Sequence, residues 1–342
     1  MSQMRNNFIK HLLVILIIFS NYSFGKEFEE LFTIYEPIES SNKIESSINS
    51  AFNNLVYRVS GSNSPSNIWR IINSGSSRKD FITSYAIKNI DNVSYLEVNF
   101  NQSLVVNKFK ELSIPIIGYS RPVILFLVEV KSGSDSSYYV TRDSEKNIDK
   151  VFIDILDSAS TKRGLFLELP TFDLEDKRNI ANSTILNSPI EEIISKYNYD
   201  QLVKIKLTNL GLDGWSLSGD INKIISQTSY SEEIYKTLND FIDLMINNQF
   251  QDMTIDTSKK SFINISIEGI KNLEEFQLSK EKLAQFISIS NLEIQSFKNN
   301  IITYKVDLIG DKKTLIANIK SSSYFEILND KDKDKLSLIF KK

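Results

Sequence analysis

Hydrophobic and polar positions along the chain predict a mixture of helices and strands. Within residues 148–159 the apolar residues recur at spacings of three and four, the pattern of a helix with one buried face. Arg163-Gly164 follows this run, and glycine commonly occupies the position after the last helical residue. Residues 203–208 instead alternate between apolar and polar side chains. This second pattern predicts a strand with one buried face.

The order of these patterns divides residues 26–342 into three small modules of mixed α/β and α+β class. The first module, residues 26–121, opens with a strand and a helix, continues with a second helical stretch, and ends with a strand and a short helix. These elements fall at 28–38, at 44–59, at 69–73 with 78–87, at 95–100 and at 104–112.

The second module, residues 122–256, begins with an almost continuous apolar strand. Its order of strand, helix, strand, helix, strand is typical of an α/β layer with a partly parallel sheet. A further helix closes it, with Ser229 and Glu232 spaced as a capping box. The elements fall at 123–130, 148–159, 165–169, 189–197, 199–208 and 232–245.

The third module, residues 257–342, has the order βαββαβ, which is the ferredoxin-like arrangement. We expect Ser279 to cap its first helix, and Asn299-Asn300 to form the turn between its central strands. The elements fall at 263–267, 279–287, 292–297, 302–308, 312–320 and 336–340.

The first 25 residues have the pattern of a secretory signal peptide. Basic Arg5 and Lys10 precede an unbroken apolar run at 12–19. Cleavage is expected between Gly25 and Lys26. A bilayer span needs about 20 apolar residues, so this run favours a removable signal over a retained anchor, which stays the alternative. We therefore expect a periplasmic or secreted protein of a Gram-negative bacterium, without stable membrane insertion once the signal is removed.

Composition narrows the chemistry that the mature chain could perform. The chain has no cysteine, and its single histidine, His11, lies in the expected signal. This excludes catalytic triads that need histidine or cysteine, cysteine- or histidine-ligated zinc, haem, iron–sulfur clusters and disulfides. We expect no cofactor, and the composition favours a protein without enzymatic activity.

Charge gives little indication of a nucleic-acid partner. Loss of the signal would leave a net charge of −5, because Arg5 and Lys10 are removed with no acid. Residues 257–342 carry 15 basic and 11 acidic residues, a small excess in which the two signs are interspersed. Such a pattern is far from a basic stripe, so we expect no nucleic-acid binding.

One acidic segment is the best candidate for a ligand or metal site. Residues 169–176 read Leu-Pro-Thr-Phe-Asp-Leu-Glu-Asp and follow a predicted strand, where ligands often bind in α/β sheets. Asp173, Glu175 and Asp176 could hold a divalent cation or serve a hydrolase. Alternatively, Asp173 caps a short helix and the other two acids lie in its first turn.

A second acidic segment imitates the start of a calcium loop. Asp330, Asp332 and Asp334 have the spacing of the first ligands of such a loop. However, Lys335 stands where the loop needs glycine, and Lys341 where it needs glutamate. We therefore expect a solvated loop that binds no calcium.

Several segments together resemble the proteobacterial exported family known only as domain of unknown function two thousand sixty-six. They are Leu-Val-Tyr-Arg-Val-Ser-Gly at 55–61, Ile-Pro-Ile-Ile-Gly-Tyr-Ser-Arg-Pro at 114–122, Arg163-Gly164, Leu-Glu-Leu-Pro-Thr-Phe-Asp-Leu-Glu-Asp at 167–176, residues 197–203 and Gly214-Trp215. The second module is similar, at fold level, to the amino-terminal domain of the periplasmic protein TolB. The resemblance implies no activity and no catalytic residue. The fold-level similarity to TolB implies an assembly or protein-binding role, and we expect another envelope protein as the partner.

Overall fold

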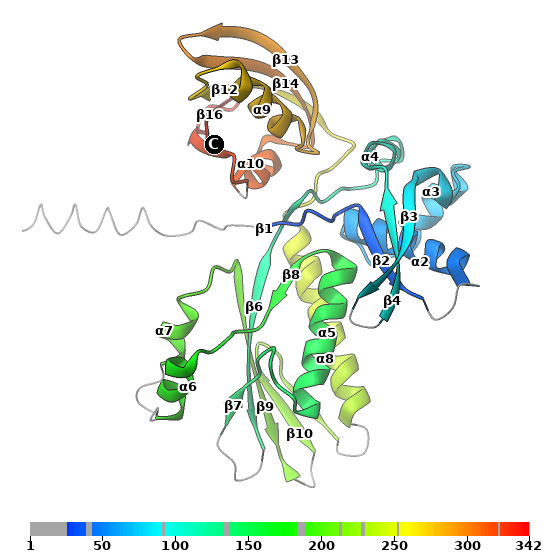
Figure 1. Ribbon diagram of the computed structural model, residues 1–342, viewed down its shortest axis with the longest axis vertical. Coiled ribbons are helices and arrows are strands. Elements are labelled where there is room, and N and C mark those ends of the chain that lie inside the picture. Colours follow the sequence, from blue (N-terminus) through cyan, green and yellow to red (C-terminus); the bar gives the residue numbers. More distant parts are fainter. Residues whose placement is uncertain are drawn as a thin grey trace, which may run out of the picture.

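The computed structural model describes most of the chain after the expected signal. The described residues are 26–38, 43–90, 93–132, 137–182, 189–211, 214–226, 230–251, 253–320 and 322–341. The expected signal, including Gly25 of the cleavage site, and the expected cap Ser229 lie outside them. Figure 1 shows helices packed on several separate sheets, so the chain has a mixed α/β and α+β fold. Each of the three larger sheets comes from one continuous stretch of sequence.

The first sheet is antiparallel, has the order β2-β4-β3, and is covered on one face by helix α2. The helix buries the predicted stripe, including Phe52 and Leu55, against Leu96 and Val98 of β4. The elements of this part are β2 (Thr33–Pro37), α2 (Ile44–Ser60), α3 (Ser66–Asn73), η2 (Arg78–Phe81), β3 (Ile82–Ile90), β4 (Val93–Phe100) and α4 (Gln102–Glu111).

The helix expected at residues 78–87 is wrong. Only a short 3₁₀ turn forms there, closed by a capping box between Ser77 and Asp80. The following residues form β3, which pairs with β4 along its length. Their local sequence is rich in β-branched and aromatic residues, and pairing with β4 decides the conformation over the helical spacing.

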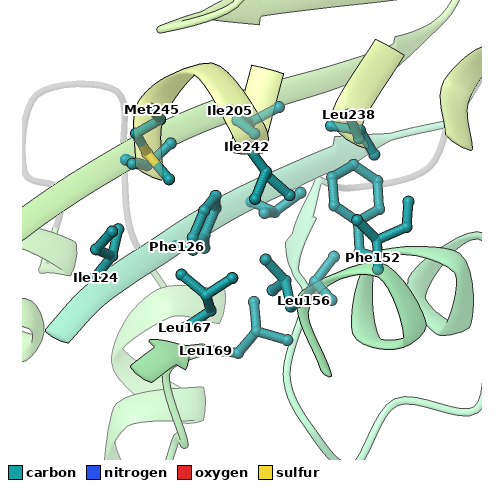
Figure 2. Packing of buried hydrophobic residues seen from close by; sticks show 14 of the residues in the cluster. Ile124, Phe126, Phe152, Leu156, Leu167, Leu169, Ile205, Leu238, Ile242 and Met245 are labelled. Carbon is teal, nitrogen blue, oxygen red and sulfur yellow. The ribbon is translucent and has the colours of Figure 1, made fainter. Parts of the chain in front are cut away.

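The second sheet is partly parallel, and its first strand, β6, is buried on both faces, as expected from its apolar sequence. Its order is β11-β10-β9-β6-β7, with β8 beside β6, and β6 runs parallel to β8 and β9. Figure 2 shows Phe126 and Ile205 of this sheet packed beside Leu156 and Ile242 of the two long helices. The elements are β6 (Val123–Lys131), β7 (Tyr138–Tyr139), α5 (Asn147–Arg163), β8 (Phe166–Glu168), α6 (Leu174–Ala181), α7 (Ile190–Ile194), β9 (Gln201–Asn209), β10 (Trp215–Gly219), β11 (Lys223–Ile225) and α8 (Tyr230–Gln251).

The third sheet has the order β13-β14-β12-β16-β15, with β12 parallel to β16. In a ferredoxin-like unit the last strand follows the second helix directly and runs antiparallel to the first strand. Here β15 follows α10, and β16, which pairs with β12, runs parallel to it, so the observed order is βαββαββ and departs from the expected βαββαβ at its end. The turn at Asn299-Asn300 is confirmed by positive φ angles of 51° and 61°. One strand, β15, was not expected and extends the sheet beside β16. The elements are β12 (Lys260–Glu268), α9 (Leu273–Ala284), β13 (Ile289–Lys298), β14 (Ile301–Ile309), α10 (Lys312–Lys320), β15 (Phe325–Asn329) and β16 (Lys335–Phe340).

The expectation that Ser279 caps helix α9 is also wrong. The helix begins earlier, where the side chain of Asn272 accepts a hydrogen bond from the Glu275 backbone at 2.9 Å. Ser279 is buried inside the helix and donates its hydroxyl to the Phe276 carbonyl at 2.9 Å. Asparagine is as good an N-cap as serine. The helix can therefore begin at Leu273, with the Asn272 side chain accepting a hydrogen bond from one of the free backbone N–H groups at its start.

Three buried arginines join the first and second sheets, and we call Arg58, Arg121 and Arg163 the arginine cluster. Arg121, with no exposed surface, donates to the carbonyls of Arg58 at 3.0 Å and Arg163 at 3.4 Å. Its other bonds reach the carbonyls of Gly118 at 2.9 Å and Ile117 at 3.2 Å. Residues 58 and 163 lie in the last turns of α2 and α5, so one side chain ties the two helix ends together.

The other two arginines extend this connection. Arg58 donates to the carbonyl of Thr33 at 2.8 Å and to that of Thr161 in α5. Arg163 donates to the carbonyl of Gly61 and to the side chain of Asn247 in α8, both at 2.8 Å. The cluster therefore links α2, α5, α8 and the start of the first sheet.

Backbone carbonyls, rather than carboxylates, stabilise the charge of Arg121. The last carbonyls of a helix lack partners within the helix and carry the negative end of its dipole. Burial, together with the smaller effect of the charges of Arg58 and Arg163, lowers the pKa of Arg121 to about 9. A pKa of this size leaves the guanidinium charged at neutral pH.

The glycine after α5 is required by this packing. Gly164 has a φ of +63°, and a Cβ placed on it would lie 2.6 Å from Cγ of Arg58. The predicted end of this helix at Arg163-Gly164 is therefore confirmed. Glycine is required at this position both because the backbone is left-handed and because Arg58 packs closely against it.

The third sheet contacts the first through apolar residues and one short backbone pairing. Ile287 and Ile309 belong to the same hydrophobic cluster as Ile114 and the core of the first sheet. Ile116 and Ile255 exchange backbone hydrogen bonds at 3.1 and 2.7 Å. None of the helices within the described ranges is long and apolar enough to cross a membrane.

Arg121→Met should lower the free energy of unfolding by about 3 kcal/mol or more, because it leaves buried carbonyls without donors. Urea denaturation of both proteins measures the difference. Arg178→Met, at an exposed arginine in α6, is the control and should change stability by no more than about 0.5 kcal/mol. Equal stability of Arg121→Met and the native protein would contradict a structural role for the cluster.

Candidate functional site

The acidic segment predicted as a ligand loop forms the amino-terminal end of helix α6. Asp173 is the cap residue, and its Oδ1 accepts a hydrogen bond from the Asp176 backbone at 2.7 Å. Oδ2 of Asp176 in turn accepts from the Asp173 backbone at 3.3 Å, which completes a capping box. Oδ1 of Asp176 accepts from Nζ of Lys196 at 2.8 Å. Both oxygens of Asp176 thus have partners within the protein.

Nearby groups stabilise the negative charges of this segment. The hydrogen bond from Lys196 lowers the pKa of Asp176 below its usual range. Glu175 is exposed in the first turn of α6, where the helix dipole favours an anion. Within the described ranges, no group of three or more histidine, cysteine, aspartate or glutamate side chains could hold a metal ion. A cation site at Asp173, Glu175 and Asp176 therefore stays a prediction to be tested by titration.

The loop that imitates a calcium site is organised by a lysine. Nζ of Lys312, at the start of α10, donates to the carbonyls of Asp330 at 2.8 Å, Asp332 at 2.5 Å and Lys335 at 2.7 Å. The ammonium group thus holds the backbone of this loop through three carbonyls. Nothing in the local sequence of the loop indicates this contact, because Lys312 lies 18 residues before Asp330.

The most unusual surface of the first sheet is its outer strand, β3. This nine-residue strand stands at the end of the order β2-β4-β3, so among the described strands its outer side has no partner. Residues 84–90 are exposed without interruption. An unpaired strand edge offers a row of backbone donors and acceptors to another chain.

The face of β3 that continues the hydrophobic core is also uncovered. Tyr85 pairs with Val98 and Ile87 with Leu96, and both residues of β4 are fully buried beneath α2. Paired residues share a face of the sheet, yet Tyr85 and Ile87 are each 54% exposed. The reason is that α2 packs chiefly on β2 and β4.

A groove lies beside this uncovered face. It has a volume of about 610 Å³ and runs between the start of α2 and the beginning of β3. Ile44 and Ile48 of the helix form one wall, and Ile82 and Tyr85 form the other. We call the free side of β3, its apolar face and this groove together the β3 edge.

The other described strands at sheet ends are short or irregular, and β2, at the opposite end of the first sheet, has only five residues. Strands β7 and β11 have two and three residues, and β13 and β15 contain register shifts. Short length and bulges are common ways to prevent unwanted pairing. From Ser84 to Ile90, β3 pairs with β4 in an unbroken register, and its one charged residue, Lys88, forms an ion pair with Glu97. It is therefore the least protected long edge in the part of the chain that the structure describes.

The β3 edge was missed in the sequence because its strand was predicted as a helix. The alternation of Tyr85 and Ile87 with small or polar neighbours is a strand pattern that could have indicated it. The pattern is weak because the strand lacks a buried face, and neighbouring apolar residues also fit helical spacing.

Asp173→Ala should lower the free energy of unfolding by about 1 kcal/mol, because it removes the cap of α6. Glu175→Ala is the control, with a smaller effect expected. Thermal unfolding with calcium or magnesium tests the alternative, because a cation at 100 times its dissociation constant would stabilise the native protein by about 2.7 kcal/mol. We expect no cation-dependent shift, and a shift lost in Asp173→Ala would establish the cation site instead.

Known proteins offer no match to this chain: no family model, no curated protein and no solved structure matches it. The resemblances to the exported family and to the amino-terminal domain of TolB therefore stay predictions. Any function has to be argued from the geometry of the chain itself.

Proposed function

We propose that this protein is exported from the cytoplasm and acts in the cell envelope as a non-enzymatic binding or assembly adaptor, which receives an extended segment of another envelope protein at the β3 edge. The observation that carries the proposal is a nine-residue strand that has no partner on its outer side among the described strands and whose core-side face is apolar and exposed. Strand addition to such an edge is a common mode of peptide recognition.

The β3 edge defines the chemistry of the segment that would fit. Backbone hydrogen bonds to β3 supply part of the affinity and require an extended conformation. Alternate side chains of the segment would face the groove and meet Ile48, Tyr85 and Ile87, so these positions should be apolar. The edge itself offers little charge, since Lys88 is already paired with Glu97.

Export is supported by the basic and apolar pattern of the first 25 residues and by the position of the expected cut. Lys26 and Glu27 form β1 (Lys26–Glu27), which pairs with β5 (Ser120–Arg121). Cleavage after Gly25 would leave this pairing whole. Arg58, Arg121 and Arg163, which come from three of the segments quoted for the resemblance to the exported family, meet in the arginine cluster.

The mature protein should begin at Lys26. Amino-terminal sequencing or intact mass measurement of protein isolated from the envelope fraction checks this. A protein that keeps residues 1–25 and fractionates with the inner membrane after salt and carbonate washes would show that the signal is retained as an anchor.

A photoreactive phenylalanine analogue in place of Tyr85 should crosslink to one discrete partner in intact envelopes. The reason is that this side chain lies where an added strand would pack. The same analogue in place of Ile224 is a matched control, because Ile224 is 70% exposed on β11, another strand at a sheet end.

Adding Ile87→Glu to the Tyr85 probe should abolish the adduct, because it places a charge on the apolar face of the β3 edge. Adding Ile224→Glu should leave it unchanged. The proposal fails if the Tyr85 probe gives no adduct, or if the adduct persists in the presence of Ile87→Glu.

A further inference from the structure

Strand β13 forms a second free sheet edge, and the side chains along it complement those of a second copy of the same strand. The ten-residue strand stands at the end of the third sheet, and among the described strands only β14 pairs with it (Figure 1). Two of its apolar residues are largely exposed, Ile294 at 51% and Phe297 at 61%. This strand carries two residues of opposite charge, Glu293 and Lys298, whereas the one charged residue of β3, Lys88, forms an ion pair with Glu97.

A bulge decides which of these side chains share a face. Ile294 pairs with Tyr304 and Phe297 with Ile302, both buried on the core side of the sheet. Residues three apart in a regular strand point to opposite faces, but the register shift between Ile294 and Ser296 brings these two to the same face. The same shift brings Glu293 and Lys298 together on the opposite face, beside Lys305 and Ile301.

Two β13 strands that run antiparallel about a two-fold axis would have matching pairs. With the axis between Gln295 and Ser296, Ile294 of one copy lies opposite Phe297 of the other. In the same register Glu293 lies opposite Lys298, and each pair occurs twice. An aromatic residue opposite a β-branched residue, and a pair of opposite charges, both favour strand pairing.

The charges and the bulge also select against other strands. A strand without a bulge at the same place would put its apolar side chains opposite Glu293 or Lys298 on one half of the pairing. Neither charged residue makes an ion pair within the residues that the structure describes, so both remain available to a partner. The occupant that fits both faces is a second copy of this chain.

We propose that two copies associate edge to edge through β13, which joins their third sheets into one continuous sheet about a two-fold axis. The interface uses the pairs Ile294 with Phe297 and Glu293 with Lys298. It does not depend on the function proposed for the β3 edge, which lies in another sheet.

Sedimentation equilibrium of the mature protein tests this proposal. The native chain should be dimeric at about 100 μM, a concentration that saturates an interface of micromolar affinity. Glu293→Lys and Lys298→Glu should each weaken the dimer by at least about tenfold, because each variant places like charges opposite one another twice.

Charge exchange makes the test specific for the register. An equal mixture of Glu293→Lys and Lys298→Glu should form heterodimers, since opposite charges again face each other at both positions. The double variant should form homodimers for the same reason. Ile87→Glu, on the β3 edge, is the control and should leave the dimer unchanged.

Unaltered thermal unfolding of each variant at low concentration would show that the fold is retained. A native chain that is monomeric at about 100 μM overturns the proposal, because even micromolar affinity would be visible there. The proposal is also overturned if Glu293→Lys and Lys298→Glu each dimerise as strongly as the native chain. It is overturned as well if the equal mixture of these two variants stays monomeric.

Discussion

The arrangement of this protein depends on the charge of a fully buried arginine. Arg121 has no carboxylate partner among the hydrogen bonds of the described residues. Its guanidinium instead donates hydrogen bonds to carbonyls at the ends of α2 and α5 and to those of Ile117 and Gly118. A buried charge is costly unless its donors are satisfied, so these helix ends have to lie beside Arg121. Since α2 covers the first sheet and α5 covers the second, the constraint also places the two sheets relative to one another.

The elements that the sequence predicted correctly are those with one buried face, because burial leaves a regular pattern of apolar residues. Helix α5 and the alternating strand β9 could be predicted because their apolar residues follow the period of an element with one buried face. Strand β3 was missed because it lacks such a face, which leaves only a weak alternation in its sequence. The contacts of Lys312 and of the arginine cluster could not be predicted, because they join residues far apart in the sequence. For the acidic segment the sequence offered two interpretations, and the structure shows the hydrogen bonds of the capped helix.

The two long free edges differ in how they restrict pairing. Strand β3 has a regular register next to its apolar residues and no free charge, so many extended apolar segments could pair with it. Strand β13 has a bulge and opposite charges, which are devices that reduce unspecific pairing. An edge of the first kind suits a partner that presents a flexible segment, whereas an edge of the second kind suits a partner of one defined pattern.

The separation of the two edges has a consequence for binding strength. They lie on different sheets, so pairing through β13 would leave both β3 edges of a dimer open. The arginine cluster and the apolar contacts of Ile287 and Ile309 hold the sheets of each copy in a defined relation, so the two open edges would keep a defined separation. A partner that presents two suitable segments at that separation would bind the second edge at a high effective concentration. Weak binding at one strand edge would then be sufficient for a stable assembly, provided that the partner is itself repeated or oligomeric.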